Sequence, residues 1–265
     1  GAGEQETSTA SIMVGNTAPT LNSIAITPDA GIDTSSTLSC AVNVVDADLE
    51  TLTPTYAWYN GSTLLGSGSS FTLTPSMAQP SDTVQCVASV TDGYGATVNE
   101  TASVTIDNTA PVIDSVTISP TVSYNDTTMT CTVASSDADN QSMITTYVWN
   151  NSTQGTALGT SVNLTLDSNI ASRNDVIECI ATVTDASGDT ATSTASITLG
   201  NRVPSSPTVT IDPSVAYIDS TLTCIPSGSV DDDGDTVSYS YEWTVNGGSV
   251  VSTTSTLSGE FVAGD

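Results

Sequence analysis

Aspartate pairs separated by one residue are the groups in this 265-residue sequence whose type and spacing best suit chemistry. Residues 230–236 read VDDDGDT, and related segments at 46–50 and 137–141 read DADLE and DADNQ. In each copy the two aspartates stand 12 and 10 residues before a tryptophan. The D-x-D-x-(D/E/Q) spacing places oxygens at alternate positions, as in loops that bind hard cations such as calcium. The competing interpretation is a solvated turn, because aspartate favours turns and no copy matches a complete EF-hand loop.

Catalysis by these carboxylates is a third interpretation, which the rest of the sequence disfavours. Paired carboxylates hydrolyse glycosides when one has a raised pKa and both flank a cleft. Here the pair recurs in every copy, on what is expected to be a water-exposed rim. The sequence has no histidine, no lysine and no G-x-S-x-G segment, so other hydrolytic arrangements are missing as well. We therefore expect no catalytic residue, and a protein that is not an enzyme.

The charge of the chain limits its partners. Twenty-nine acidic residues against two basic ones give a formal net charge of −27. Nucleic acid is excluded as a partner because binding its backbone requires lysine and arginine, and an anionic membrane surface would repel the chain. No apolar run approaches 18 residues and no leader-like segment opens the sequence, so neither a membrane span nor a signal peptide is expected. Such a field does attract divalent cations.

Internal repeats show which elements must position these groups. NTAP at 16–19 recurs at 108–111, and NRVP at 201–204 is a looser third copy, giving periods of 92 and 93 residues. Cysteines and tryptophans keep the same period, with Trp58 and Trp149 separated by 91 residues. The chain therefore contains copies of a unit of about ninety residues.

Alternating side chains indicate β-strands within each unit. The segments at 36–45 (STLSCAVNVV), 83–92 (TVQCVASVTD) and 101–106 (TASVTI) place apolar residues on one face with a period of two. No stretch has a convincing helical period. Strands separated by turns at this repeat length predict an all-β chain of seven-stranded sandwiches.

The order cysteine, tryptophan, cysteine carries a resemblance to the immunoglobulin fold. Cys40, Trp58 and Cys86 form one such series, and the second unit repeats it at 131, 149 and 179. In that fold, cysteines of strands B and F bridge the sheets and a strand C tryptophan packs against them. The tyrosine expected two residues before the second cysteine is absent. The chain resembles tandem immunoglobulin-like (Ig-like) repeats of prokaryotic cell-surface and extracellular proteins, of adhesin or filament type, which implies tandem sandwiches in a linear array.

The resemblance also implies disulfides and a compartment. The expected pairs are Cys40 with Cys86 and Cys131 with Cys179, each closing a long loop in a small domain. Disulfides imply an oxidising environment, so we expect an extracellular or cell-surface location. Buried free thiols in a cytosolic protein are the alternative, whereas zinc is disfavoured because no CxxC or histidine occurs.

The repeat phase predicts the domain boundaries. Residues 1–17 align with the last strand of a unit, residues 18–108 and 109–200 form complete domains, and residues 201–265 form a domain lacking its last two strands, F and G. Cys224 accordingly has no expected partner. Two explanations remain open: an excerpt of a longer repetitive chain, or donation of the N-terminal strand to a neighbouring subunit. In both cases the expected partners are copies of the chain, or further repeats of it, arranged end to end.

Calcium, the one expected cofactor, would bind where loops converge. In an Ig-like sandwich the B–C and F–G loops share the end that the preceding linker enters. A calcium ion there would neutralise repulsion and stiffen the joint, rather as in cadherin-like repeats, and the solvated turn remains the alternative. The candidate ligands are Asp46, Asp48, Glu50, Asp92, Asp107, Asp137, Asp139, Asp185, Asp231, Asp233 and Asp235.

N-glycosylation triplets are a further signal of an extracellular surface. In a sequence this rich in serine and threonine several must arise by chance, so only part of the set is expected to carry glycans. The acceptors are Asn60, Asn99, Asn125, Asn140, Asn150, Asn151 and Asn163.

These observations predict a structural component of an extracellular filament, stalk or surface rod. It would be built from disulfide-bridged repeats, stiffened by calcium and glycosylated. An adhesin whose loops bind a carbohydrate or protein ligand is the alternative, although the exposed tyrosines form no recurring cluster.

Overall fold

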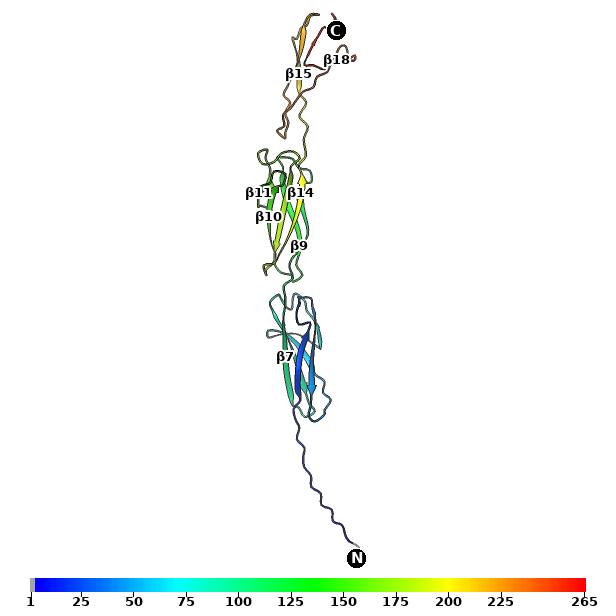
Figure 1. Ribbon diagram of the computed structural model, residues 1–265, viewed down its shortest axis with the longest axis vertical. Helices are drawn as coiled ribbons and strands as arrows, with labels where there is room; N and C mark the ends of the chain where they lie inside the picture. The colour runs from blue at the N-terminus through cyan, green and yellow to red at the C-terminus, as the bar shows by residue number, and fades with distance from the viewer. Residues whose placement is uncertain (1–2) are drawn as a thin grey trace. The chain divides into compact units, whose positions relative to one another are not determined.

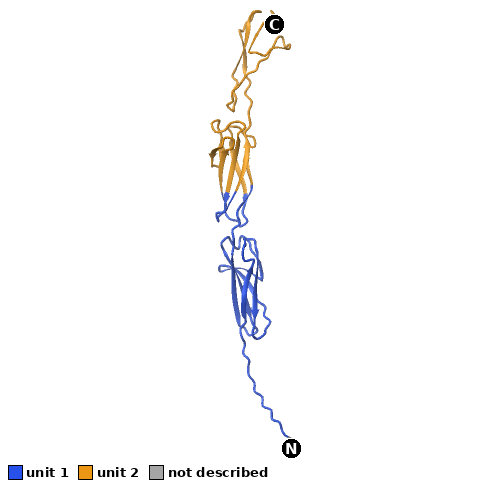
Figure 2. Cartoon of the chain, in the orientation of Figure 1, with its two compact units in different colours: residues 1–114, 135–144, 183–191 blue, residues 115–134, 145–182, 192–265 orange. Residues whose placement is uncertain are grey.

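The computed structural model describes residues 3–265, which form 19 strands and no helix (Figure 1). Among these residues no helix of the length and apolarity needed to cross a membrane is found. The chain divides into two compact units (Figure 2). The first contains residues up to Asp114 together with Ser135–Ile144 and Val183–Ala191, and the second contains the rest. The expected all-β fold of successive sandwiches is therefore confirmed.

Residues 20–106 form the first seven-stranded sandwich. One sheet has the order β1-β2-β5 and the other β4-β3-β6-β7. Alternation determines which side chains are buried: in β6, Val84, Cys86, Ala88 and Val90 face the core while Thr83 and Thr91 are exposed. The strands are β1 (Thr20–Thr27), β2 (Thr37–Val45), β3 (Thr55–Asn60), β4 (Thr63–Ser67), β5 (Ser70–Thr72), β6 (Thr83–Thr91) and β7 (Thr97–Thr105).

The second sandwich repeats this topology, with sheets β8-β9-β12 and β11-β10-β13-β14. Its core contains Met129, Trp149, Leu166 and Ile177, all of them buried. The strands are β8 (Val112–Ser119), β9 (Thr128–Ser136), β10 (Ile144–Asn151), β11 (Thr156–Gly159), β12 (Asn163–Thr165), β13 (Val176–Thr184) and β14 (Thr190–Thr198).

A disulfide joins the two sheets of each complete sandwich. Cys40 of β2 is bonded to Cys86 of β6, and Cys131 of β9 is bonded to Cys179 of β13. The pairing agrees with the one that the resemblance implies. Trp58 lies opposite Cys86 across β3 and β6, and Trp149 shares the core of the second sandwich with Cys131 and Cys179.

Residues 201–265 contain five strands, in sheets β15-β16-β19 and β17-β18. These correspond to the first five strands of the other sandwiches. Cys224 is half-buried and has no disulfide partner. The strands are β15 (Thr208–Asp212), β16 (Thr221–Ser227), β17 (Trp243–Thr244), β18 (Val250–Ser252) and β19 (Thr256–Ser258).

The strand expected within residues 1–17 is not seen. Residues 1–2 lie outside the described residues, and residues 3–19 adopt no strand and expose nearly all their side chains, including Ile12 and Met13. A strand is stabilised by hydrogen bonds to a neighbouring strand. No strand in the described part of the chain pairs with this segment.

Candidate metal and linker site

The first aspartate of each acidic loop organises the loop itself. Asp46 accepts a hydrogen bond from the backbone N–H of Asp48 at 2.7 Å, and Asp137 accepts one from Asp139 at 2.9 Å. The third loop repeats this bond at 2.8 Å between Asp231 and the N–H of Asp233. This is the local turn that aspartate favours. The turn component of the sequence interpretation is therefore present in all three copies.

The second aspartate of each loop binds the linker that precedes its sandwich. Asp48 accepts the backbone N–H of Thr17 at 2.6 Å, and Asp139 accepts that of Thr109 at 2.7 Å. Asp233 accepts the N–H of Arg202 in the same way. We call this recurring bond the linker clamp. It was missed from sequence, although the separation of 30 or 31 residues between the linker residue and the second loop aspartate was a usable signal.

Asp139 is the most enclosed member of the linker clamp. Its side chain is buried, and its second carboxylate oxygen accepts the Thr34 hydroxyl at 2.6 Å. Both carboxylate oxygens therefore have hydrogen-bond donors, as a buried charge requires. This predicted metal ligand already has a structural role.

A second bond ties the linkers of the two complete sandwiches to their F–G turns. The amide of Asn16 donates to Asp92 at 2.8 Å, and the amide of Asn108 donates to Asp185 at 2.9 Å. Asn108 also donates to Asp189 at 2.7 Å. Asp107, the predicted metal ligand that lies in a linker, is exposed and belongs to no metal-compatible group among the described residues.

These hydrogen bonds shift the pKa of the turn aspartates. The pKa of Asp92 is lowered, chiefly by the Asn16 amide and also by backbone N–H groups, against a raising effect of desolvation. For Asp185, desolvation is the largest influence and raises the pKa. The Asn108 amide and the N–H groups of the turn outweigh it, so the net shift is downward. Both carboxylates are therefore ionised at neutral pH.

Acid is expected to release this linker bond. A carboxyl whose pKa is lowered on folding stabilises the fold above its unfolded pKa, here 3.8, and the contribution disappears as pH falls through the lower folded value. Thermal unfolding in chelator, followed from neutral pH to below 3.8, should show a smaller acid-dependent loss in Asn108→Ala than in the unmodified chain. The control is Asn201→Ala, because the Asn201 amide binds only the adjacent Arg202 carbonyl. Equal acid dependence in all three proteins would contradict the assignment.

The first acidic loop contains the metal-compatible group of the described residues. Asp46, Glu50 and Asp92 each place a carboxylate oxygen within 4.8 Å of the others. The Oδ2 atom of Asp46 is buried and has no hydrogen-bond partner. In the second loop, Gln141 stands where the first has Glu50, and its amide group bonds Ser187 instead. The first two loops therefore differ. The first brings three carboxylates together, and the second has the Gln141 amide in place of the third carboxylate.

Arginine side chains from other segments pair with aspartates of the third acidic loop. The Arg202 guanidinium contacts Asp233 at 2.8 Å and Asp126 at 3.0 Å, and lies 4.7 Å from the centre of the Tyr124 ring. Arg173 pairs with Asp235 at 2.6 Å. Hydrogen bonding to Asp126, followed by Asp233, raises the pKa of Arg202 above its ordinary value. Both basic side chains of the chain are thus paired within or beside VDDDGDT.

Two predicted glycosylation sites are inaccessible in the folded chain. Asn125 and Asn151 are buried; the amide nitrogen of Asn125 donates to the backbone carbonyl of Asp233, and that of Asn151 donates to the Asp175 carboxylate. A glycan replaces a hydrogen on that nitrogen, so these two predictions do not fit the folded structure. Asn60 forms the equivalent bond to Asp82 in the first sandwich, although it is only half-buried. The acceptors Asn99, Asn140 and Asn163 are exposed and Asn150 is half-buried.

The Asn60 and Asn151 bonds belong to a motif present in all three sandwiches. At the end of the third strand an asparagine amide donates to an aspartate that also accepts a backbone N–H of its own turn. In the third sandwich, Asn246 donates to Asp265 at 2.6 Å, and Asp265 accepts the N–H of Val262. These asparagines have a structural role that triplet searching cannot detect.

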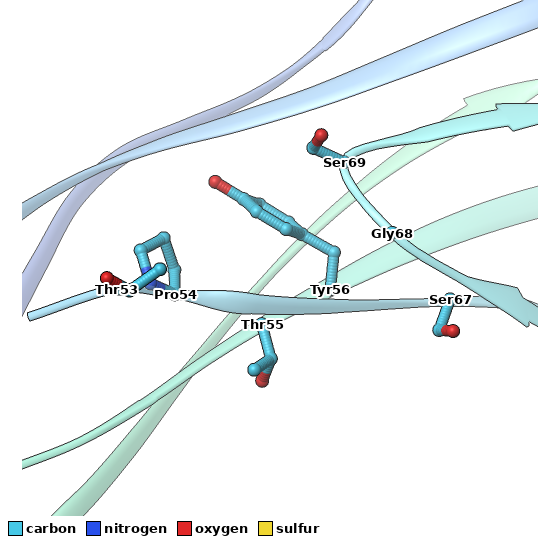
Figure 3. A pocket seen from close by; sticks show the side chains of 7 residues that line it. All are labelled: Thr53, Pro54, Thr55, Tyr56, Ser67, Gly68 and Ser69. Carbon is cyan, nitrogen blue, oxygen red and sulfur yellow. The ribbon is translucent and has the colours of Figure 1, made fainter.

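One surface hollow of the described residues lacks the side chains that usually act as acids or bases near neutral pH. It measures about 590 Å³ and lies beside β3, where Tyr56 and Pro54 project to one side of the strand and Thr55 to the other (Figure 3). Its lining residues are Thr53, Pro54, Thr55, Tyr56, Ser67, Gly68 and Ser69. General acid–base catalysis needs a group that titrates near the working pH. This lining offers no carboxylate, imidazole, thiol or amine.

No protein-family model matches the chain, and no curated protein sequence is significantly similar to it. Several solved structures resemble it. They include three N-terminal domains of the highly immunogenic outer capsid protein (Hoc) of bacteriophage RB49, at 17% identity, 69% of this chain, 70% of that one and a TM-score of 0.29. The FN1–FN3 domains of chicken CNTN1 match at 11% identity, with 92% and 85% coverage and a TM-score of 0.30.

A third similar structure is a Ca²⁺-stabilized adhesin described as helping an Antarctic bacterium to reach out and bind ice. It is 18% identical over 81% of this chain and 59% of that one, with a TM-score of 0.29. At these values the fold assignment depends on the strand order of the present chain.

Proposed function

We propose that this chain is a structural segment of an extracellular filament, stalk or surface rod, made of Ig-like sandwiches joined end to end. It acts as a spacer and catalyses no reaction. In this proposal calcium bound by acidic-loop carboxylates at one site adds stiffness, glycans on exposed asparagines add protection, and the neighbours of the chain are further repeats of the same kind.

The recurring linker clamp is the observation that carries this proposal. In all three copies a loop aspartate binds the backbone N–H that follows the linker asparagine. In the two complete sandwiches the asparagine side chain is bound as well. A spacer has to transmit force from one domain to the next, so its linkers must be held to the domains that follow them. Carboxylates used in this way serve mechanical continuity rather than chemistry.

The disulfides support a location outside the cytoplasm. Each bridge joins the two sheets of a sandwich, and such bonds persist in oxidising compartments. The excess of 27 negative charges keeps copies of the chain soluble and excludes polyanionic partners. Exposed acceptors such as Asn99 and Asn163 lie on strands, where a glycan would shield the sheet from pairing with other chains.

A ligand-binding role is the second candidate. Tyr94 is 78% exposed and follows the F–G aspartate of the first sandwich, with Asp48 and Glu50 beside it. An exposed aromatic ring next to carboxylates is a feature of carbohydrate-binding and protein-binding loops. The second sandwich has Ser187 at this position, so the feature does not recur.

Immunogold electron microscopy of intact source cells, with antibodies against the purified chain, tests the proposal. We expect label along extended surface structures, and mass spectrometry without reduction should show that Cys40, Cys86, Cys131 and Cys179 are protected from alkylation by their disulfides. The intact mass should exceed the polypeptide mass if glycans are present. Label confined to the cytoplasm, with all cysteines alkylated, would rule the proposal out. Label at discrete contact points with a host or surface would instead favour the adhesin.

A further inference from the structure

We propose that calcium binds one of the three acidic loops, the first, through Asp46, Glu50 and Asp92. The proposal deepens the proposed function, on which it rests for the role of the ion as a stiffening element. The binding itself is independent of where the protein is located. The sequence predicts a calcium ion at every acidic loop, whereas we propose a single ion, at the first loop.

The first loop contains a buried carboxylate oxygen that nothing in the protein satisfies. Asp46 is 8% exposed, its Oδ1 atom accepts the N–H of Asp48, and its Oδ2 atom has no partner. Leaving a buried charged acceptor without a hydrogen-bond partner destabilises the fold more than leaving a neutral one does. Glu50 and Asp92 add two negative charges within 4.8 Å, and no basic side chain is nearby to offset them. A divalent cation at the centre satisfies the oxygen and removes the repulsion.

The F–G turn of the first sandwich is shaped to admit Glu50. Gly93 follows Asp92, and a side chain there would begin 3.0 Å from Oε1 of Glu50. The Gly93 backbone N–H also donates weakly to Glu50 at 3.3 Å. The second sandwich has Ala186 at the equivalent position and Gln141 in place of Glu50. Both differences disfavour a third carboxylate beside the aspartates of the second loop.

The second loop has the neutral side chain of Gln141 where the first loop has the carboxylate of Glu50. The Gln141 amide bonds the Ser187 hydroxyl at 2.9 Å, and Asn108 joins Asp185 to Asp189. Oδ2 of Asp137 and Oδ1 of Asn108 remain without partners, but no group of three carboxylate oxygens forms around them in the described chain. Without a third carboxylate close by, a cation would gain less Coulomb energy here than in the first loop.

Arginine provides the positive charge of the third loop. Asp233 is paired with Arg202 and Asp235 with Arg173, which removes two of the three carboxylates in the D-x-D-x-D series. Hydrogen bonds between a guanidinium and a carboxylate are strengthened by the charges of both groups. Calcium would have to displace both of them. VDDDGDT, the most acidic of the three segments, is therefore the one least in need of a metal ion.

The ligand set suits calcium. Calcium takes six to eight oxygens at about 2.3–2.6 Å in flexible geometry, whereas magnesium requires a nearly ideal octahedron at about 2.0–2.1 Å and keeps its water. Opposite oxygens around a calcium ion lie about 4.8 Å apart, so the spacing of the three carboxylates accommodates one ion between them. Three carboxylates that each bind through one or two oxygens, completed by water, fill its shell.

Isothermal titration of calcium chloride into the full chain tests the proposal, at about 0.15 M sodium chloride so that diffuse attraction to the negative surface is screened. We expect one equivalent bound, a rise in the unfolding temperature of the first sandwich, and much weaker binding of magnesium. Glu50→Gln and Asp46→Asn should each abolish saturable binding. Asn at position 46 can still accept the Asp48 N–H, so circular dichroism should remain unchanged.

Matched variants in the other loops decide between this site and adventitious binding. Asp231→Asn should leave the titration unchanged, while Gln141→Glu combined with Ala186→Gly should add a second equivalent. The proposal is overturned by two or three equivalents in the unmodified chain, by binding that survives Glu50→Gln, or by the absence of saturable binding at millimolar calcium. None of these outcomes bears on the surface location, which the immunogold experiment tests separately.

Discussion

Replacing Cys40 and Cys86 together by alanine is expected to lower the free energy of unfolding of the first sandwich by roughly 4 kcal/mol. The bridge spans 46 residues, and in the chain-entropy model a loop of this length restricts the unfolded chain by that amount. Both half-cystines are buried in the core, so alanine leaves a small void and adds no unsatisfied polar atom. For a domain of this size, the loss corresponds to a decrease of roughly 20 °C in unfolding temperature.

Calorimetry of the full chain measures this effect, because the sandwiches are expected to unfold in separate transitions. The transition of the first sandwich should shift, and that of the second should not. Cys224→Ser is the matched control, since that thiol is half-buried and bonded to nothing. A double variant that shifts the transition no more than Cys224→Ser does would show that the bridge contributes little to stability.

Much of the fold could be predicted from sequence, because its cause is local and repetitive. Alternation in segments such as 83–92 determines which face of a strand is buried, and the structure buries Val84, Cys86, Ala88 and Val90 as that pattern predicts. The resemblance to Ig-like repeats implied that Trp58 packs beside a Cys40–Cys86 bridge, and the core of the first sandwich contains all three residues. The prediction of the buried face of a strand depends on local spacing alone, and not on which distant residues come into contact.

The roles of individual carboxylates could not be predicted in this way. A D-x-D segment has the same spacing whether its second aspartate binds a metal ion or the linker N–H, as Asp48 and Asp139 do. The partner depends on contacts between residues 30 or more apart. Asn125 and Asn151 show the same limitation: a glycosylation triplet does not reveal burial. The strand expected before residue 18 likewise depended on a neighbour that the described chain does not provide.

The three acidic loops illustrate how one geometry tolerates different charges. Each keeps the turn made by its first aspartate and the linker clamp made by its second. The remaining carboxylates have different surroundings in the three loops. In the first loop three carboxylates come together and one oxygen is unsatisfied, in the second a neutral amide replaces one of them, and in the third arginine pairs with them. The turn and the linker clamp are therefore common architecture, whereas the rest of each loop is free to vary.

Truncating Trp149 to alanine is expected to cost the second sandwich about 3–5 kcal/mol, the range found when a fully enclosed aromatic side chain is removed. Its indole ring is inaccessible to solvent within the cluster that includes Cys131 and Cys179, and its Nε1–H donates to the Ser161 carbonyl at 2.8 Å. The substitution removes this packing and leaves that carbonyl without its donor. Calorimetry of the full chain should show a strongly lowered second transition.

The matched comparison is Trp243→Ala in the third sandwich, where the same hydrogen bond is made to Thr254 at 2.9 Å. Trp243 is 8% exposed and borders a hollow of about 210 Å³ lined by Leu222, Leu257 and Phe261. A ring that already faces open space loses fewer contacts when it is removed, because the cost of truncation depends on how many atoms surround the side chain. The Trp243 variant should therefore lose clearly less stability than the Trp149 variant. Equal losses would mean that the hydrogen bond of the indole, which the two sites share, outweighs the packing that they do not.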